Sequence, residues 1–186
     1  MSAAASHDVH VLDHDRLRAA HGLFGAAIHR GPASDERWAR VLPTFVPGRT
    51  LGVDIDGALA GTTTSFPTLT AVPGGAALPT AAVTRVGVRA DRTRRGVLTA
   101  LMRRQLADVA AAGEALAILG ATEALIYGRF GYGIATRGRR LRVRRTGGSG
   151  WRDGAPGGGT VRALEPDELL KVLVPLHRRI ALDRPG

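Results

Sequence analysis

The segment VTRVGVRADRTRRGVLTALMRRQ, residues 83–105, changes from a β-branched pattern to a helical one across a short basic loop. Its first residues predict the end of a strand, and the stretch that begins at Val97 predicts an amphipathic helix. The loop between them carries Arg92, Arg94, Arg95 and Gly96. A helix that starts directly after such a loop presents free N–H groups and the positive end of its dipole to an anion. The junction is therefore a candidate site for a phosphate or pyrophosphate.

A plainer interpretation of this loop is a solvated basic turn in which Gly96 eases the chain into the helix. The loop has neither the Gly-Lys-Ser/Thr of a Walker A loop nor the GxGxxG of a dinucleotide-binding turn. The residues alone leave both interpretations open.

Strand and helix patterns alternate on both sides of the junction. We expect a strand over residues 9–13, then a helix capped by Asp15 and a second helix capped by Ser34. Asp56-Gly57 predicts a type I′ hairpin between two strands, and residues 77–88 predict another strand. This order predicts an α/β (α+β) fold with a central mixed sheet flanked by helices.

The pattern after the long helix predicts the far side of this sheet. The wholly apolar run over residues 115–121 is typical of a strand buried on both faces. Thr122 could cap a brief helix, and residues 139–145 alternate as a last strand. We therefore predict one domain over residues 1–146, a Gly-rich linker over 147–159, and over 160–186 the first strand and helix of a second, incomplete domain.

The composition narrows the class of protein. With 186 residues, of which 44% are hydrophobic, the chain can bury a sizeable core. The net charge of +10 attracts anions in general. There is no cysteine, no secretory start and no apolar run long enough for a membrane, which indicates a cytoplasmic protein without a membrane partner. Four histidines among residues 7–21 lack the spacing of a helical metal site, so we expect no metal.

Both tyrosines of the chain lie in the string IYGRFGYG, residues 126–133. From the residues alone, Tyr127 could be a buried aromatic with a locally bonded hydroxyl, or part of a site. Phe130 and Tyr132 are expected to pack the turn that the glycines allow. Together with the loop VGVRADRTRRGVL, this string resembles the Eis-like (enhanced intracellular survival) branch of the GNAT N-acetyltransferases. The resemblance extends over most of residues 1–146.

The resemblance implies a site for acetyl-CoA at the strand–loop–helix junction. Its β-strand part would bind the pantetheine arm, its loop and helix start would bind the pyrophosphate, and the end of the next strand would touch the cofactor. Those cofactor-binding positions correspond to Val86, Gly87, Val88, Arg94, Arg95, Gly96, Val97, Leu98, Thr99, Thr122 and Glu123. Tyr127 corresponds to the family's general acid. Phe24 and Trp38 would line the acceptor pocket, although helix aromatics of this kind are equally common in a core.

The same resemblance implies acetyl-CoA-dependent transfer of an acetyl group to a primary amine. The acceptor would be an aminoglycoside-like polyamine or a lysine, and homo-oligomers are a family property. The net charge argues against a cationic acceptor unless the pocket itself is acidic. In the Eis branch the general base is the carboxylate at the C-terminus of a third domain, and this sequence contains no such domain. The sequence therefore predicts a fragment or a reduced relative, and it does not settle whether this chain is active by itself.

Two other functions compete with this one. The first is a catalytically incomplete acyl-CoA-binding or regulatory domain that keeps the pyrophosphate loop. The second, ranked behind it, is a basic nucleic-acid-binding module, suggested by Arg140, Arg142 and Arg144 on one strand face. Proteins that bind single-stranded nucleic acid usually have aromatic side chains between such charges, and this predicted strand has no aromatic residue. We therefore do not expect nucleic acid as a partner.

Overall fold

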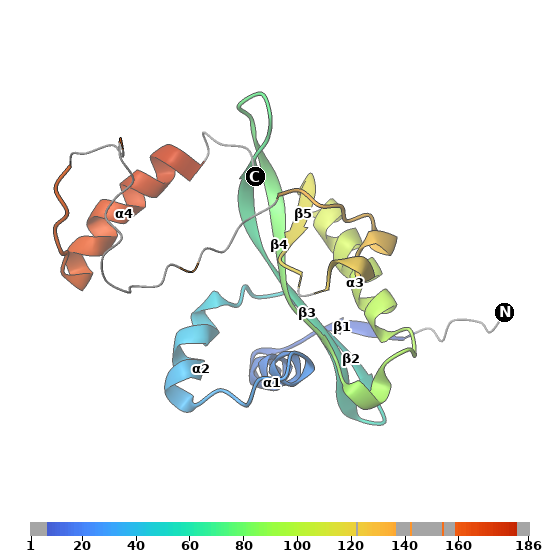
Figure 1. The fold of residues 1–186 in the computed structure, drawn as a ribbon. Coiled ribbons are helices and arrows are strands. Elements are labelled where there is room, and N and C mark those ends of the chain that lie inside the picture. The colour runs from blue at the N-terminus through green and yellow to red at the C-terminus, as the bar shows by residue number, and fades with distance from the viewer. Residues whose placement is uncertain (1–6, 122, 137–141, 143–153, 155–158, 182–186) are drawn as a thin grey trace.

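A five-stranded mixed sheet in the order β1-β2-β3-β4-β5 forms the centre of the computed structural model, which describes residues 7–121, 123–136, 142, 154 and 159–181 (Figure 1). The first four strands are antiparallel neighbours, and β5 runs parallel to β4. The elements are β1 (Val9–Val11), α1 (Leu17–Ala27), α2 (Asp35–Val41), β2 (Thr50–Ile55), β3 (Ala58–Ala71), β4 (Ala77–Val88), α3 (Val97–Ala111), β5 (Leu116–Leu119) and α4 (Pro166–Ala181). The predicted α/β class with a mixed central sheet is confirmed.

Helices cover both faces of the sheet. Figure 1 shows α1 and α2 on one side of the strands and α3 on the other. On the α3 side, Val97 and Leu101 pack against Leu51 and Val53. A second cluster, which includes Phe45, is built around α1. The sheet therefore positions the start of α3 and the helix pair α1–α2 on opposite sides of the same strands.

Two local predictions are confirmed in detail. Asp56 and Gly57 have φ angles of 54° and 75°, as both central residues of a type I′ turn require. The Ser34 hydroxyl accepts a hydrogen bond from the backbone N–H of Arg37 at 3.3 Å and so caps α2.

Two other predictions are wrong. Asp15 does not cap α1, because a 3-10 turn over His14–Arg16 precedes the helix and Arg16 holds the N-cap position. Strand β5 is not buried on both faces, and Ile118 is 38% exposed. In the part of the chain that the structure describes, β5 pairs only with β4 and so forms an edge of the sheet.

The predicted helix after the linker is present as α4, which Figure 1 places away from the sheet. The predicted strand before it is not formed, because residues 161–165 have no regular structure and pair with no strand that the structure describes. The strand predicted over residues 139–145 lies almost wholly outside the described residues, and Arg142 within it is not in a strand. The assignment of residues 160–186 to a second domain stays a prediction. No described helix has the length and apolar character needed to cross a membrane.

The contact between β3 and α3 gives a stability prediction. A Cβ built on Gly61 would lie 2.5 Å from Val97 Cγ1 and 3.0 Å from Leu101 Cδ1, and both side chains are fully buried. We expect Gly61→Ala to lower the free energy of unfolding by about 1–3 kcal/mol, because it overpacks the core. Urea denaturation measures this change.

Gly22→Ala is the matched control for this variant. A Cβ on Gly22 meets nothing within 4 Å, so alanine within α1 should raise the free energy of unfolding by roughly 0.5–1 kcal/mol. Equal effects of the two substitutions would contradict the tight contact between α3 and the sheet.

Candidate active site

The C-terminal part of β4 is not paired with the parallel strand β5. Residues Thr80–Val83 of β4 pair with Leu116–Leu119 of β5, and the pairing stops there, whereas β4 continues to Val88. The predicted positions Val86, Gly87 and Val88 lie in this continuation. Among the described residues, no strand lies beside it on the β5 side. The backbone here can therefore pair with an extended ligand, as a sheet edge does.

Helix α1 crosses β4 at this same stretch. A Cβ on Gly87 would lie 3.0 Å from the Phe24 Cα, 3.1 Å from Leu23 Cδ2 and 3.3 Å from Ala27 Cβ. The nearest of these atoms is backbone, so a side chain at this position would push α1 away from the strand by a few tenths of an ångström. The structure thereby brings Phe24 against the strand that carries the predicted site.

The basic loop turns into α3 through left-handed backbone. Arg94 has φ 60° and Gly96 has φ 86°, and Gly96 is the N-cap residue of α3 with no side-chain cap bond. The side chains of Arg94 and Arg95 are exposed, whereas Arg92 binds Asp56 at 2.9 Å. The structure thus gathers all six predicted positions from Arg94 to Thr99 at one helix start. Because no side chain caps this helix start, its N–H groups and the adjacent guanidiniums fit an anion such as a pyrophosphate.

The tyrosine segment forms two consecutive 3-10 turns, Ala124–Ile126 and Gly128–Phe130, instead of the predicted brief helix. Tyr127 lies between them, and its ring meets that of Tyr132 edge-on with centroids 5.9 Å apart. Gly131 ends the second turn with φ 91°. Tyr132 therefore packs the turn, as predicted from the sequence.

Burial raises the pKa of both tyrosine hydroxyls. It raises the pKa of Tyr127, and burial together with the neighbouring Tyr127 raises the pKa of Tyr132 to about 12. Both side chains stay protonated at neutral pH, which is the state that a proton donor needs. Among the described residues, no hydrogen bond or ring contact joins Tyr127 to β4 or to the loop. Glu123 is exposed at the start of the first turn, and Thr122 lies outside the described residues.

Four aromatic rings from α1, α2 and the segment after α2 lie together, and we call them the aromatic cluster: His21, Phe24, Trp38 and Phe45. Their centroids are separated by 5.9 Å for His21–Trp38, 5.8 Å for Trp38–Phe45 and 6.4 Å for His21–Phe24. The structure thus links the two predicted acceptor residues, Phe24 and Trp38, through His21. All four rings are largely covered, so the cluster serves the core of the domain as well as one wall of the junction.

Three residues of this region were missed from the sequence: Arg85, His21 and Phe45. The Arg85 guanidinium carbon lies 4.2 Å above the centroid of the Phe45 ring, and its Nη2 donates to Thr44 Oγ1 at 2.5 Å. The available signal was a charged residue inside a β-branched strand. His21 belongs to the aromatic cluster, because its ring contacts those of Phe24, Trp38 and Phe45. No group of three or more His, Cys, Asp or Glu in the described residues is arranged to hold a metal.

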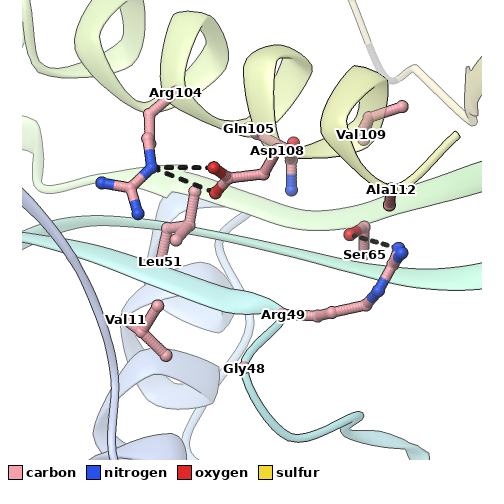
Figure 2. A pocket seen from close by; sticks show the side chains of 10 residues that line it. All are labelled: Val11, Gly48, Arg49, Leu51, Ser65, Arg104, Gln105, Asp108, Val109 and Ala112. Carbon is pink, nitrogen blue, oxygen red and sulfur yellow. Dashed lines mark hydrogen bonds and ion pairs between the residues drawn. The ribbon is translucent and has the colours of Figure 1, made fainter.

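A cavity of about 330 Å³ lies elsewhere, along the C-terminal half of α3 (Figure 2). Its polar groups mostly bind one another: Arg104 donates to Asp108 at 2.9 Å, and Arg49 binds Ser65 and the buried Glu114. None of the predicted site residues lines it. The lining consists of Val11, Gly48, Arg49, Leu51, Ser65, Arg104, Gln105, Asp108, Val109 and Ala112. The hollow is therefore separate from the junction at the start of α3.

Comparison with known proteins agrees with the fold. The model of the acetyltransferase (GNAT) domain matches residues 8–135. An uncharacterized N-acetyltransferase of Streptomyces avermitilis is 43% identical over 141 residues, which are 74% of this chain and 34% of that protein. N-acetyltransferase Eis of Mycobacterium bovis is 34% identical over 163 residues, or 84% of this chain and 40% of that protein. The crystal structure of Eis1 from Mycobacterium abscessus superposes with a TM-score of 0.62 at 43% identity, covering 69% of this chain and 31% of that one.

The chain thus spans about a third to two fifths of the length of these curated relatives. Domains of this family use acetyl-CoA as co-substrate. The matched residues include the whole sheet, the basic loop, the start of α3 and the tyrosine turns. The chain belongs to the GNAT acetyltransferase family, in the branch that contains the Eis proteins.

Proposed function

We propose that this chain binds acetyl-CoA and catalyses transfer of the acetyl group to a primary amine. The observation that carries the proposal is the junction itself. A helix start without a side-chain cap, preceded by two exposed arginines, lies one short loop after a strand whose edge is no longer paired with β5. This arrangement suits a long ligand with an amide-containing arm and a pyrophosphate, because strand edges bind amides and helix starts bind phosphates.

We assign the cofactor contacts along this path. The backbone of Val86, Gly87 and Val88 pairs with the pantetheine amides, and the N–H groups of residues 96–99 bind the pyrophosphate. Arg94 and Arg95 add charge-assisted hydrogen bonds to the phosphate oxygens. Thr122 and Glu123 contact the cofactor from the end of β5.

Tyr127 serves as the general acid in this proposal. Acetyl-CoA supplies the acetyl thioester, and the phenol holds its proton towards the sulfur that departs. With ordinary pKa values of ~10 for a phenol and ~8.5 for a thiol, complete proton transfer is uphill by about 2 kcal/mol. Burial raises the pKa of Tyr127 further, so the proton stays on the phenol and Tyr127 donates a strong hydrogen bond.

The acceptor amine must lose a proton to become a nucleophile, because a lysine-like amine with pKa ~10.4 is mostly charged at neutral pH. Glu123 is the one carboxylate in the assigned set, and its exposed position allows it to take this proton through a water molecule. Phe24 and Trp38 form the apolar wall along which the carbon chain of the amine lies.

Loss of the two loop arginines tests the cofactor site. We expect Arg94→Ala combined with Arg95→Ala to weaken acetyl-CoA binding by at least about tenfold, because two charged donors to the pyrophosphate are lost. Calorimetric titration measures the dissociation constant. Arg103→Ala removes a charge from the exposed face of α3 and is the control, with an expected change below about twofold. Equal losses in both variants would refute the assignment of the loop.

Replacement of Tyr127 tests the chemical step. Tyr127→Phe keeps the ring against Tyr132 and removes only the proton donor. We expect kcat to fall by about 100-fold, with acetyl-CoA affinity within about twofold of wild type. Release of free CoA in the presence of an amine panel provides the rate. Tyr132→Phe is the matched control and should retain kcat, because the Tyr132 hydroxyl is buried in the turn.

The pH dependence follows from the sign of the shift at Tyr127. An acid works while it is protonated, and a raised pKa keeps it protonated to higher pH. We expect the wild-type rate to rise with pH as the amine loses its proton and to show no descending limb below about pH 10. If the wild-type rate falls with pH from below pH 9, and this fall is absent in Tyr127→Phe, then Tyr127 is not a buried acid with a raised pKa. Binding of acetyl-CoA without turnover for any amine would instead favour an acyl-CoA-binding regulatory domain.

A further inference from the structure

Strand β4 contains a bulge at the beginning of the stretch assigned to the cofactor. Thr62 of β3 pairs with Gly87 and Thr64 pairs with Thr84, so Thr63 alone faces the two residues Arg85 and Val86. Arg85 adopts φ 51°, a left-handed conformation that residues with side chains rarely use. Bulges of this kind turn one side chain away from the regular alternation and are common beside active sites.

The bulge turns Arg85 towards the aromatic cluster. Its guanidinium carbon lies 4.2 Å from the centre of the Phe45 ring, and Phe45 packs against Trp38 with centroids 5.8 Å apart. The hydrogen bond from Nη2 to Thr44 Oγ1 fixes the orientation. Arg85 therefore supplies a half-buried positive charge beside the wall proposed for the acceptor, two residues past the point where β4 and β5 part.

Further positive charges lie near the aromatic cluster. Burial and, behind it, the charges of Arg85 and Arg37 lower the pKa of His21. Arg30 and Arg37 line a small hollow between α1 and α2 together with His21 and Phe24. A field that disfavours a protonated imidazole disfavours any other cation at the same place.

The carboxylates of α2 do not neutralise this charge. Asp35 accepts from Arg18 at 2.5 Å, and Glu36 accepts from the Ser34 hydroxyl at 2.8 Å. Among the residues that the structure describes, no carboxylate forms an ion pair with Arg85 or Arg37. The carboxylates of α2 thus bind Arg18 and the Ser34 hydroxyl, and among the described residues the Arg85 guanidinium has no acidic partner.

We propose that the acceptor is a primary amine that also carries a carboxylate or phosphate group, and that the Arg85 guanidinium binds this anionic group. The inference rests on the proposed acetyl transfer and gives it a substrate class. A guanidinium binds either group through paired N–H donors, and stacking on Phe45 holds its plane in place. The anion lies at Arg85, and the amine at the other end of the carbon chain reaches the thioester at the opening between β4 and β5.

Three acceptors of matched length test the charge preference: 6-aminohexanoate, hexylamine and cadaverine. We expect kcat/KM to be about tenfold higher for 6-aminohexanoate than for hexylamine, because the wall is positive. For cadaverine, kcat/KM per amino group should be lower than for hexylamine. Glucosamine and glucosamine 6-phosphate form a second pair, which distinguishes a phosphate ligand from a carboxylate ligand.

Variants of Arg85 test the assignment. Arg85→Met keeps an unbranched side chain against Phe45 and should reduce the preference to below about twofold, whereas Arg85→Lys should retain part of it. Arg103→Met removes the same charge from the exposed face of α3 and should keep the full preference, since salt screens distant surface charges. Circular dichroism confirms that each variant is folded.

The outcomes separate this inference from the function on which it rests. Absence of acetyl-CoA binding would refute the proposed function. Acetyl transfer with equal rates for the three amines, or with cadaverine preferred, would refute the anionic acceptor and leave the acetyltransferase assignment standing. A wild-type preference that persists in Arg85→Met would refute the role of Arg85. If no amine is acetylated, calorimetry with CoA present decides: tighter binding of cadaverine than of 6-aminohexanoate overturns the inference, and the reverse order, lost in Arg85→Met, supports it.

Discussion

Strand β4 keeps β3 as its partner along its whole length but keeps β5 only as far as Val83. The rest of the candidate site depends on this parting of strands. It leaves one edge of β4 open among the described residues, and the helices α1 and α3 both contact β4. The lack of a side chain at Gly87 sets how closely α1 can approach, and the left-handed residues Arg94 and Gly96 set where α3 begins. The positions that we propose for the pyrophosphate, the cofactor arm and the acceptor wall all lie at this one strand end.

Much of the fold was predictable because its signals are local. The bounds of β4 and the start of α3 agree with the predicted ones, since each change of hydrophobic period coincides with a turn residue such as Gly96. Asp56-Gly57 and Ser34 behave as their own chemistry requires. Predictions that needed tertiary contacts were less successful. Gln105 is buried in α3 and accepts a hydrogen bond from the Thr63 hydroxyl, although nothing in an amphipathic helical pattern predicts a buried polar side chain there.

Some parts of the candidate site could likewise be predicted from the sequence, and others could not. From the residues alone, the helix start with its arginines was a candidate anion site beside the plainer interpretation of a solvated turn, and the identity of the anion came only from the resemblance to a family. Tyr127 also depends on that resemblance, because an isolated tyrosine beside glycines is usually structural. The sequence shows Arg85 as a charged residue inside a β-branched strand, but it does not show towards which face the side chain points. In a regular strand its direction would follow from alternation, but the bulge opposite Thr63 changes that direction, and a bulge depends on the pairing of two strands.

The bulge also limits how the length of this chain can vary. Side chains on a strand alternate between faces, so one residue gained or lost in β4 before Gly87 would move Val88 off the α3 face and point another residue at α1. The turn at Gly74 and Gly75 at the other end of β4 has no such restriction, since both glycines face open space. Insertions and deletions should therefore accumulate at that distant turn, while the count of residues from Thr84 to Gly96 stays fixed even where the individual side chains change.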